Sequence, residues 1–373
     1  MDPPLQALIA AVAAFLFISL LFGLLVVFCR HPPVPPRLHS LSSVTVAGAG
    51  AGAGEESTFF FDPSLSRVSL TELSAATKGF SPDAIIGDGS FGFVYKAVLP
   101  SSNDVVAVKR LSSDAAAFRG FREFRAEVET LGRIRHANLA RLLAFSSSGP
   151  NDRLLIYEFL PQGSLDAWLH DPDHQIQLQI LNPDPNPLPF PIRLVIAKGI
   201  ARGIAFLHEE CKPPIIHRDI KASNVLLEVD FNPKIADFGL ARLVENSRSH
   251  VSTQVAGTMG YMAPEYKAGT TIATAKADVY SFGVLIVEVL TGRRPSWPVR
   301  EEEEGKEVGL IAWARRKVEE GKGLEILDRR MEIQAGKMEE EVRGLLDVAY
   351  KCTDDSSRER PSMGKVVKLL DQI

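Results

Sequence analysis

Hydrophobic positions divide the chain into an apolar segment near its start and a long mixed segment after it. Residues 5–28 form a run of 24 residues without a charge. At roughly 1.5 Å per residue, a helix of this length exceeds a hydrocarbon core of about 30 Å. The pattern predicts a transmembrane helix over residues 5–28, preceded by a short extracytosolic amino terminus, residues 1–4.

Charged residues beside this run predict its orientation. Asp2 precedes the run, and basic residues and histidines follow it: Arg30, His31, Arg37 and His39. The positive-inside rule places the rest of the chain in the cytosol, with almost no ectodomain. A cleaved signal peptide would need a basic start, a shorter apolar stretch and an adjacent small-residue site, so the pattern favours an anchor. Cys29 is either an ordinary flanking cysteine or a palmitoylation site.

Between the run and the folded region, residues 29–64 predict a flexible juxtamembrane linker. They contain a proline-rich stretch, residues 31–36, and an alternating Ala-Gly repeat, residues 47–54, with too little side chain to pack. A lead-in segment, residues 65–84, follows. Within it, Ser69 is a candidate helix cap, and Leu70, Leu73 and Ala76 have helical spacing.

The pattern then turns strand-like around a glycine-rich stretch. Gly87, Gly89 and Gly92 form G-x-G-x-x-G with Ser90 and Phe91 between them. Glycines let a hairpin backbone lie over phosphates without Cβ clashes. The same motif opens dinucleotide-binding folds, but there a helix follows, whereas residues 93–98 continue as strand. A second β-rich run, residues 105–109, ends in Lys109, which is suitably placed to reach phosphates.

Apolar residues return at helical spacing over residues 118–135. The inward face consists of Phe121, Phe124, Val128, Leu131 and Ile134. A helix with one buried face is therefore expected after the second strand.

Composition narrows the function classes. The chain has 373 residues, 45% hydrophobic, and a formal net charge of -4. This charge balance predicts no nucleic-acid partner, since neutralising phosphates needs a clustered basic surface. The three cysteines lack the spacing of a metal or redox site and fit a reducing compartment.

The most specific stretch is IIHRDIKASNVLL, residues 215–227, followed by KIADFGL, residues 234–240. Phosphoryl transfer needs a carboxylate at the attacking hydroxyl and oxygen ligands for Mg²⁺. In this interpretation Asp219 orients the hydroxyl and accepts its proton, Lys221 steadies the γ-phosphate, and Asn224 and Asp237 hold the metal.

These motifs, together with VSTQVAGTMGYMAPEY and the opening TKGFSPDAIIGDGSFGFVYKA, resemble a eukaryotic protein kinase domain of the plant receptor-like, Pelle-related group. The resemblance implies an α+β bilobal fold over residues 85–373. A small antiparallel sheet lobe with one helix would span residues 85–160, and a large α-helical lobe residues 161–373. ATP and Mg²⁺ would be the cofactors.

The resemblance also assigns the nucleotide site. It places Tyr157 at the back of the ATP pocket and the hinge at residues 158–160, with Glu158 and Leu160. Glu127 would pair with Lys109, whereas Glu123 and Glu129 are expected to be surface charges. The adenine would lie between four apolar residues: Ile86, Val94, Ala107 and Leu226.

Other matching residues are expected to be structural. The residues that join the lobes would be Leu131, Leu142, His217 and Phe238. Glu265 and Arg360 resemble a buried ion pair, and Asp278 resembles the residue that anchors the catalytic loop.

A segment rich in hydroxyl groups follows Asp237. A phosphate on Ser252 or Thr253 would recruit Arg218 and order this loop, because charge-assisted bonds to phosphate are strong. Thr258 resembles the family threonine that contacts the catalytic carboxylate and shapes substrate docking. Lys221 is the family's mark of Ser/Thr specificity.

Two stretches depart from the family pattern. Residues 171–191 are long and proline-rich and are expected to form an exposed loop, and residues 301–304 form an acidic run expected to stay solvated.

Two alternatives to a membrane-anchored Ser/Thr protein kinase stay open: a kinase-fold scaffold that docks to a receptor complex, and a small-molecule kinase. Expected partners are protein substrates, membrane lipid, and either a receptor-like kinase or a second copy of the chain at the membrane.

Overall fold

The computed structural model describes residues 58–60, 69–89, 92–100, 102–111, 117–132, 134–149, 152–172, 188–244, 251–252, 257–267, 272–300, 306–331, 333–334 and 336–373. All of them belong to one compact unit, residues 55–373. No helix within these ranges is both long enough and apolar enough to cross a bilayer. Several predicted features lie outside them: the span 5–28, Cys29, Ser90, Phe91, Thr253 and the acidic run 301–304.

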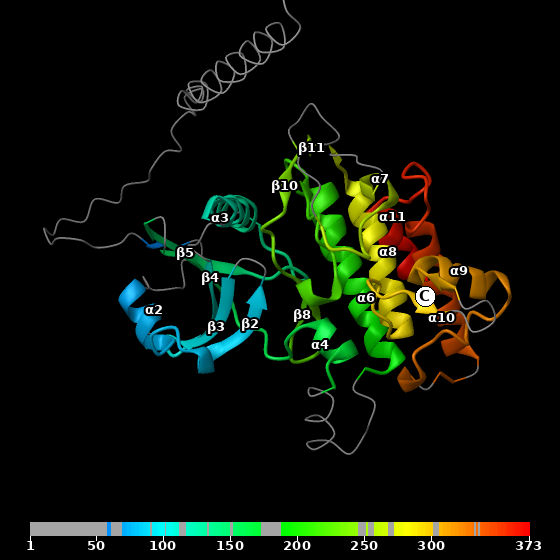
Figure 1. Ribbon diagram of the computed structural model, residues 1–373, viewed down its shortest axis with the longest axis horizontal. Coiled ribbons are helices and arrows are strands. Elements are labelled where there is room, and N and C mark those ends of the chain that lie inside the picture. Colours follow the sequence, from blue (N-terminus) through cyan, green and yellow to red (C-terminus); the bar gives the residue numbers. More distant parts are fainter. Residues whose placement is uncertain are drawn as a thin grey trace, which may run out of the picture. The chain divides into compact units, whose positions relative to one another are not determined.

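A six-stranded antiparallel sheet forms the small lobe, with the strand order β1-β5-β6-β4-β3-β2. The strands are β1 (Thr58–Phe60), β2 (Ile85–Gly89), β3 (Gly92–Val98), β4 (Val105–Leu111), β5 (Leu142–Gly149) and β6 (Asp152–Glu158). Helix α3 (Ala117–Leu131) accompanies the sheet (Figure 1). The strand-like runs predicted at residues 93–98 and 105–109 are thus β3 and β4, paired in register from Gly92↔Leu111 to Val98↔Val105.

The short lead-in helix α2 (Leu70–Ala76) covers one part of this sheet. Its cap is the predicted one, because Ser69 Oγ accepts a hydrogen bond from the Glu72 amide at 3.1 Å. Leu73 is fully buried in an apolar cluster with strand residues that include Tyr95 and Val108. The serine therefore identified the cap, and the spacing of apolar residues identified the buried face.

Helices dominate the large lobe, and helix α8 (Ala275–Thr291) lies among them (Figure 1). The other helices are α4 (Leu165–His170), α6 (Phe190–Ala205), the π-helical turn Phe206–Glu210, α7 (Pro264–Lys267), α9 (Leu310–Glu319), α10 (Lys337–Cys352) and α11 (Met363–Leu370). Helix α8 is buried along nearly its whole length, begins at the Thr274 cap and ends at Gly292 in the left-handed conformation. It is therefore the apolar centre of this lobe.

Short strands and 3-10 turns lie in the connections between these larger elements. The strands are β7 (Ile215–Ile216), β8 (Val225–Leu227), β9 (Pro233–Ile235), β10 (Arg242–Leu243), β11 (Val251–Ser252), β12 (Ile272–Ala273), β13 (Val299–Arg300) and β14 (Glu307–Val308). The 3-10 turns are Pro82–Ala84, Ala222–Asn224 and Arg329–Met331.

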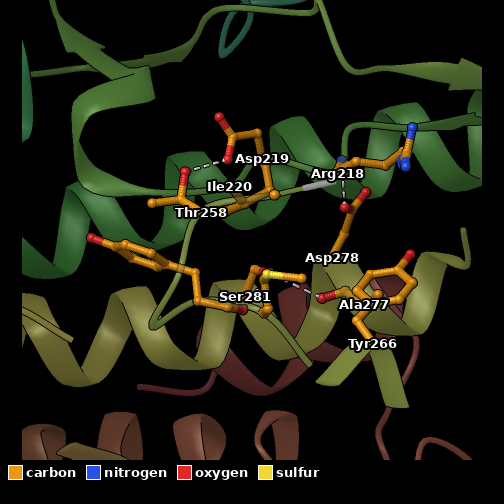
Figure 2. A pocket seen from close by; sticks show the side chains of 11 residues that line it. Arg218, Asp219, Ile220, Thr258, Tyr266, Ala277, Asp278 and Ser281 are labelled. Carbon is orange, nitrogen blue, oxygen red and sulfur yellow. Dashed lines mark hydrogen bonds between the residues drawn. The ribbon is translucent and has the colours of Figure 1, made fainter. Parts of the chain in front are cut away.

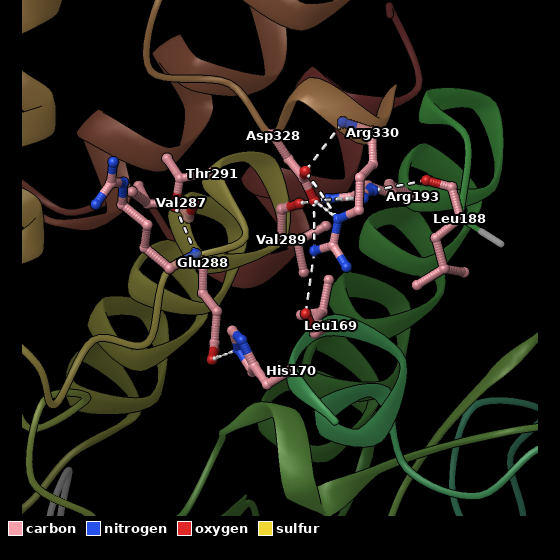
Figure 3. A network of polar contacts seen from close by, with 11 residues as sticks. Leu169, His170, Leu188, Arg193, Val287, Glu288, Val289, Thr291, Asp328 and Arg330 are labelled. Carbon is pink, nitrogen blue, oxygen red and sulfur yellow. Dashed lines mark hydrogen bonds and ion pairs between the residues drawn. The ribbon is translucent and has the colours of Figure 1, made fainter. Parts of the chain in front are cut away.

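A polar network fixes three helices of the large lobe (Figure 3). Arg193 of α6, only 1% exposed, donates to the carbonyls of Leu188 and Val289 and to Asp328 Oδ2. Arg330 binds the same Asp328 and the carbonyl of Leu169 in α4. A buried guanidinium is tolerated here because each of its nitrogens has an acceptor.

Two expectations from the sequence need correction. The helix predicted over residues 118–135 ends at Leu131, where Gly132 follows, a residue that disfavours helix interiors. The stretch 171–191 is not entirely an exposed loop, since Leu188 and Phe190 are buried and α6 begins at Phe190. Proline is compatible with the start of a helix such as α6, but the number of prolines in the whole stretch 171–191 suggested a loop.

Three residues of the predicted linker, 58–60, also take part in the fold. Thr58, Phe59 and Phe60 pair with Ser146, Phe145 and Ala144 of β5. β-prone residues beside an edge strand favour such pairing.

Candidate active site

Strand β4 places Lys109 inside the site, opposite Val94 of β3 and Leu155 of β6. Its Nζ lies 2.6 Å from Glu127 Oε1 and 2.8 Å from Asp237 Oδ1, and the residue is 7% exposed. Burial opposes the charge, but the two carboxylates outweigh it and raise the pKa of Lys109. The ammonium therefore stays charged and joins the small lobe to the segment that carries Asp237.

Glu127 of α3 is the acid that contacts Lys109, and it is completely buried. Its other oxygen, Oε2, accepts a hydrogen bond from the Tyr157 hydroxyl of β6. Burial raises the pKa of Glu127 to about 7, although Lys109 opposes this shift. No signal in the sequence linked Tyr157 to Glu127, because they lie on different elements 30 residues apart.

The prediction that Glu123 is a surface charge was wrong, whereas Glu129 is exposed as expected. Glu123 is 4% exposed and packs against Gly239, where a Cβ would lie 3.3 Å from the Glu123 Cβ. The missing side chain of Gly239 leaves room for this helix turn. The position of Glu123 along its helix could not reveal a contact with Gly239, which lies more than a hundred residues later in the sequence.

Three polar side chains lie against Asp219. Its Oδ1 accepts a hydrogen bond from Thr258 Oγ1 at 2.7 Å (Figure 2), while its Oδ2 lies 3.0 Å from Asn224 Nδ2 and 2.9 Å from Lys221 Nζ. Lys221 Nζ also donates to Thr258 Oγ1 at 2.9 Å. The structure thus brings together Asp219, Lys221, Asn224 and Thr258, and an aliphatic hydroxyl already lies on the carboxylate.

Asp278 of α8 holds the loop that carries Asp219. Its two oxygens accept the backbone amides of His217 and Arg218, both at 2.8 Å, and His208 Nε2 lies 2.9 Å away. Arg218 and Asp237 both have positive φ, 73° and 61°, a costly conformation for residues with side chains. The bonds to Asp278 offset this cost at Arg218, as the predicted anchoring role requires.

His217 is buried and stacks edge-on against Phe238, with ring centroids 4.6 Å apart. Burial lowers the pKa of His217, although nearby carboxylates oppose this shift, and so favours the neutral ring. Phe238 belongs to one apolar core with Leu131 and Leu142, the other residues expected to join the lobes.

The expected nucleotide residues lie on neighbouring strands. Gly92 has φ 152°, and a Cβ there would lie 2.0 Å from the Arg110 carbonyl oxygen, so only glycine fits. Gly87 pairs with Val94, and Ala107 pairs with Tyr157. The side chain of Glu158 is already used, because its Oε1 accepts the Arg141 amide and lies 3.2 Å from Lys234 Nζ. A nucleotide would therefore meet the backbone at Glu158.

Four residues of the expected adenine slot keep accessible apolar surface: Ile86, which is 49% exposed, and the half-buried Val94, Ala107 and Leu226. Leu160 is buried. An apolar slot with a few polar groups is the usual composition of a cofactor site.

The donor set also fits a magnesium nucleotide. Although burial opposes its charge, Lys109 holds the pKa of Asp237 low, so the carboxylate remains an anionic ligand. Both hydrogen bonds from the Asn224 side chain use Nδ2, which leaves the amide oxygen for a cation. Oxygen ligands of these kinds are the ones Mg²⁺ prefers.

Glu265 and Arg360 form the expected ion pair of the large lobe. Both oxygens of Glu265 lie 2.8 Å from guanidinium nitrogens of Arg360, which is 1% exposed. Arg360 also donates to the carbonyls of Asp354 and Lys276. Although burial opposes it, Arg360 holds the pKa of Glu265 low.

Comparison with known proteins agrees with this fold. Residues 80–369 match the protein kinase domain. The chain belongs to the protein kinase family. A solved structure of the pseudokinase domain of BIR2, described as an immune regulator of the RLK/Pelle family, superposes with a TM-score of 0.65 at 31% identity, covering 86% of this chain and 90% of that one.

Several curated relatives are plant receptor or receptor-like kinases. Leucine-rich repeat receptor protein kinase EMS1 of Arabidopsis thaliana is 46% identical over 84% of this chain and 25% of its own length. Phytosulfokine receptor 2 of the same plant is 40% identical over 95% of this chain and 33% of its own. Proline-rich receptor-like protein kinase PERK7 is 41% identical over 82% and 41%. The chain thus spans a quarter to two fifths of these relatives.

Proposed function

We propose that this chain is a protein serine/threonine kinase that transfers the γ-phosphate of Mg-ATP to protein hydroxyls. One observation carries the proposal: Asp219 accepts a hydrogen bond from an aliphatic hydroxyl, that of Thr258, beside the ammonium of Lys221. A substrate serine or threonine would meet the same carboxylate. The oxygens of Asn224 and Asp237 and the ammonium of Lys109 complete the set that phosphoryl transfer needs.

Mg-ATP would supply the phosphoryl group that is transferred, and its metal ion would supply the positive charge that activates this group. Lys109, kept charged by Glu127 and Asp237, would contact the α- and β-phosphates, and Asn224 and Asp237 would hold the metal. Asp219 orients the acceptor hydroxyl and takes its proton, while Lys221 neutralises charge beside it. Each of these residues therefore acts by holding a reacting group in position or by supplying charge beside it.

Removal of the metal tests this chemistry. We expect the full-length chain to label a serine-containing protein with the γ-phosphate in the presence of Mg²⁺. Chelation with EDTA should lower the rate by at least ~10³-fold, because the triphosphate loses the cation that Asn224 and Asp237 hold. Restoring Mg²⁺ in excess should restore the rate. Labelling that persists without divalent metal would contradict the proposed roles of both residues.

The pKa of Glu127 leads to a pH prediction. Above pH 7 its carboxylate is charged and holds Lys109, whereas below pH 7 it gains a proton and the attraction weakens. We expect kcat/KM to fall about tenfold between pH 8 and pH 6, as expected for one essential group with a pKa near 7. The E127Q variant should be slower at every pH and should lose this slope. Titration of ATP itself would change kcat/KM of the wild-type and E127Q proteins alike. Parallel pH profiles of the two proteins would therefore contradict the assignment of this pKa to Glu127.

A kinase-fold scaffold is the second candidate, favoured by the pseudokinase domain among the solved neighbours. One measurement distinguishes a kinase from a scaffold: the amount of phosphate transferred per molecule of nucleotide bound. A scaffold would bind ATP or a partner without transfer, whereas a kinase would turn over. The presence of Lys109, Asp219, Asn224 and Asp237 supports turnover.

Membrane attachment and signalling belong to the same proposal. The apolar run 5–28 and the receptor names of the relatives support a single-pass protein at the plasma membrane with a cytosolic kinase domain. Its partners would be protein substrates, membrane lipid, and a receptor-like kinase or another copy of the chain. Recovery of the full-length chain in the soluble fraction of cells would contradict this location.

Phosphorylation at Ser252 or Thr253 is the regulation we propose for this site. Arg218 lies close enough to Arg122 of α3 and Arg242 of β10 for their charges to interact, so three guanidiniums gather where the loop begins. Burial and, to a smaller extent, these like charges lower the pKa of Arg242. A phosphate on Ser252 or Thr253 would relieve the repulsion between these guanidiniums. Unchanged activity of a doubly substituted S252A/T253A chain would contradict this proposed regulation.

A further inference from the structure

The lead-in segment bends sharply after α2 and is fixed in that bend by Thr77. Lys78, Gly79 and Phe80 all have positive φ, 53°, 73° and 58°, a conformation that is costly for residues with side chains. Thr77 is completely buried, and its hydroxyl donates to the Leu73 carbonyl at 2.8 Å and accepts a hydrogen bond from the Phe80 amide at 3.1 Å. These hydrogen bonds offset the cost of the bend, which turns Phe80 back onto the small-lobe sheet.

The Phe80 ring contacts two neighbouring strands of this sheet. It meets the ring of Tyr95 in β3 edge-on, with centroids 5.3 Å apart, and the guanidinium carbon of Arg110 in β4 lies 4.4 Å from its centroid. A cation over the face of an aromatic ring is attracted by the ring electrons. Tyr95 is buried in the same apolar cluster as Leu73 of α2. Phe80 therefore ties the guanidinium of Arg110 to the lead-in segment.

Arg110 lies at a point of β4 that adjoins two parts of the candidate nucleotide site. Its carbonyl oxygen is so close to the backbone of Gly92 that a Cβ at residue 92 would lie 2.0 Å from it. Arg110 also directly follows Lys109, and because side chains alternate along a strand, these two side chains point to opposite faces of the sheet. The guanidinium is therefore on the face away from the site of Lys109, and its contact with Phe80 acts on that site through the backbone of β4.

We propose that Phe80 and Arg110 are positioning residues for ATP. Their contact holds β4 so that Lys109 and the glycine-bearing hairpin of β2 and β3 are correctly placed to bind the phosphates. This role rests on the kinase function proposed above. Helix α2 and Thr77 precede residues 80–369, the region that matches the protein kinase domain, yet they fix the ring on which the contact depends. The lead-in segment is thus a working part of the nucleotide-binding unit.

The test measures nucleotide affinity in the full-length chain, as the KM for ATP in phosphate transfer and as the Kd for Mg-ATP by calorimetry. The F80L and R110M variants remove the ring and the charge, respectively. We expect each to raise both constants about threefold to tenfold, the range of a partly buried cation–π contact. The F80L/R110M double variant should bind ATP no more weakly than the weaker single variant, since the second change removes no further contact between the two side chains. The KM for the protein substrate should not change.

Conservative and distant variants supply the controls. F80Y retains an aromatic ring and R110K a cation, so both should stay closer to the wild-type KM for ATP than F80L and R110M. R293M removes a cation–π contact of the large lobe, in which Arg293 lies 4.9 Å from the ring centroid of Trp313 in α9, and should leave the KM for ATP unchanged. A purely structural role of Phe80 and Arg110 would lower the folded fraction, and with it kcat, without raising the KM for ATP. Thermal unfolding of every variant measures that fraction.

Different results would overturn the positioning role and the kinase function. If the KM and Kd for ATP stayed within about twofold of wild type in both F80L and R110M, the positioning role alone would fall. It would also fall if the two increases multiplied in the double variant, because the two residues would then act independently. A wild-type chain that bound Mg-ATP without transferring phosphate would contradict the kinase function, and the Kd values of the variants would still decide the positioning role. Absence of Mg-ATP binding by the wild-type chain would overturn both.

Discussion

Replacing Asp219 by asparagine should lower the rate of phosphate transfer by about 10²- to 10⁴-fold, the range that loss of a positioned proton acceptor produces. Asparagine has nearly the same shape and can still accept the Thr258 hydroxyl at Oδ1. It lacks the charge that attracts Lys221, and it cannot accept a proton from the acceptor hydroxyl. The loss should therefore appear in kcat, with little change in the affinity for ATP.

The measurement is γ-phosphate transfer at saturating Mg-ATP, together with nucleotide affinity by calorimetry. D347N is a suitable control, because the side chain of Asp347 is 64% exposed and pairs only along one helix turn with Lys351. A D219N rate that is lower than the wild-type rate by less than tenfold would mean that another residue accepts the proton. Equal labelling by the wild-type and D219N proteins would instead indicate a contaminating kinase.

Replacing Arg360 by leucine should destabilise the large lobe by about 3 kcal/mol, the lower end of the cost of removing one partner from a buried ion pair, because the Glu265 side chain is 24% exposed. The change would leave the Glu265 carboxylate and the carbonyls of Asp354 and Lys276 without their donor. Contact between the guanidinium and the Tyr280 ring, 4.9 Å from its centroid, would also be lost. Unfolding by urea, followed by circular dichroism, measures the effect.

R202L provides the matched control for this change. Arg202 pairs with Asp371 at 2.9 Å, but the two side chains are 52% and 48% exposed. Exposed pairs contribute roughly 0–1 kcal/mol, so this variant should unfold close to the wild-type midpoint. If R360L and R202L shifted the midpoint equally, the buried pair would not be a major source of stability.

The residues of the site could be found from the sequence because phosphoryl transfer fixes their chemical types within short motifs. Lys109 at the end of a strand-like run, and Asp219, Asn224 and Asp237 in two adjacent motifs, could be named without any knowledge of distances. Apolar spacing likewise located α2 and α3. These features are local, so a short window of sequence contains them.

Features that depend on contacts across the fold could not be found in this way. The burial of Glu123 depends on Gly239, and the Tyr157 bond to Glu127 depends on how a helix packs against a strand. Similarly, Glu288 of α8 binds His170 of α4 and Tyr261 of a turn, and no pattern in the sequence predicts that it binds both. Burial of Leu188 and Phe190 was hidden by prolines, which suit both loops and first helical turns.

The position of β1 has a mechanical consequence. In the strand order, β1 occupies one edge of the sheet and the glycine-bearing β2 the opposite edge. Tension applied from the amino-terminal side would first load the pairing of Thr58, Phe59 and Phe60 with β5. These three residue pairs should separate before the force reaches β2. The pairing of β1 with β5 therefore protects the nucleotide-facing hairpin from force. Single-molecule stretching should register it as a small early release, and its absence after deletion of residues 58–60 would identify the source.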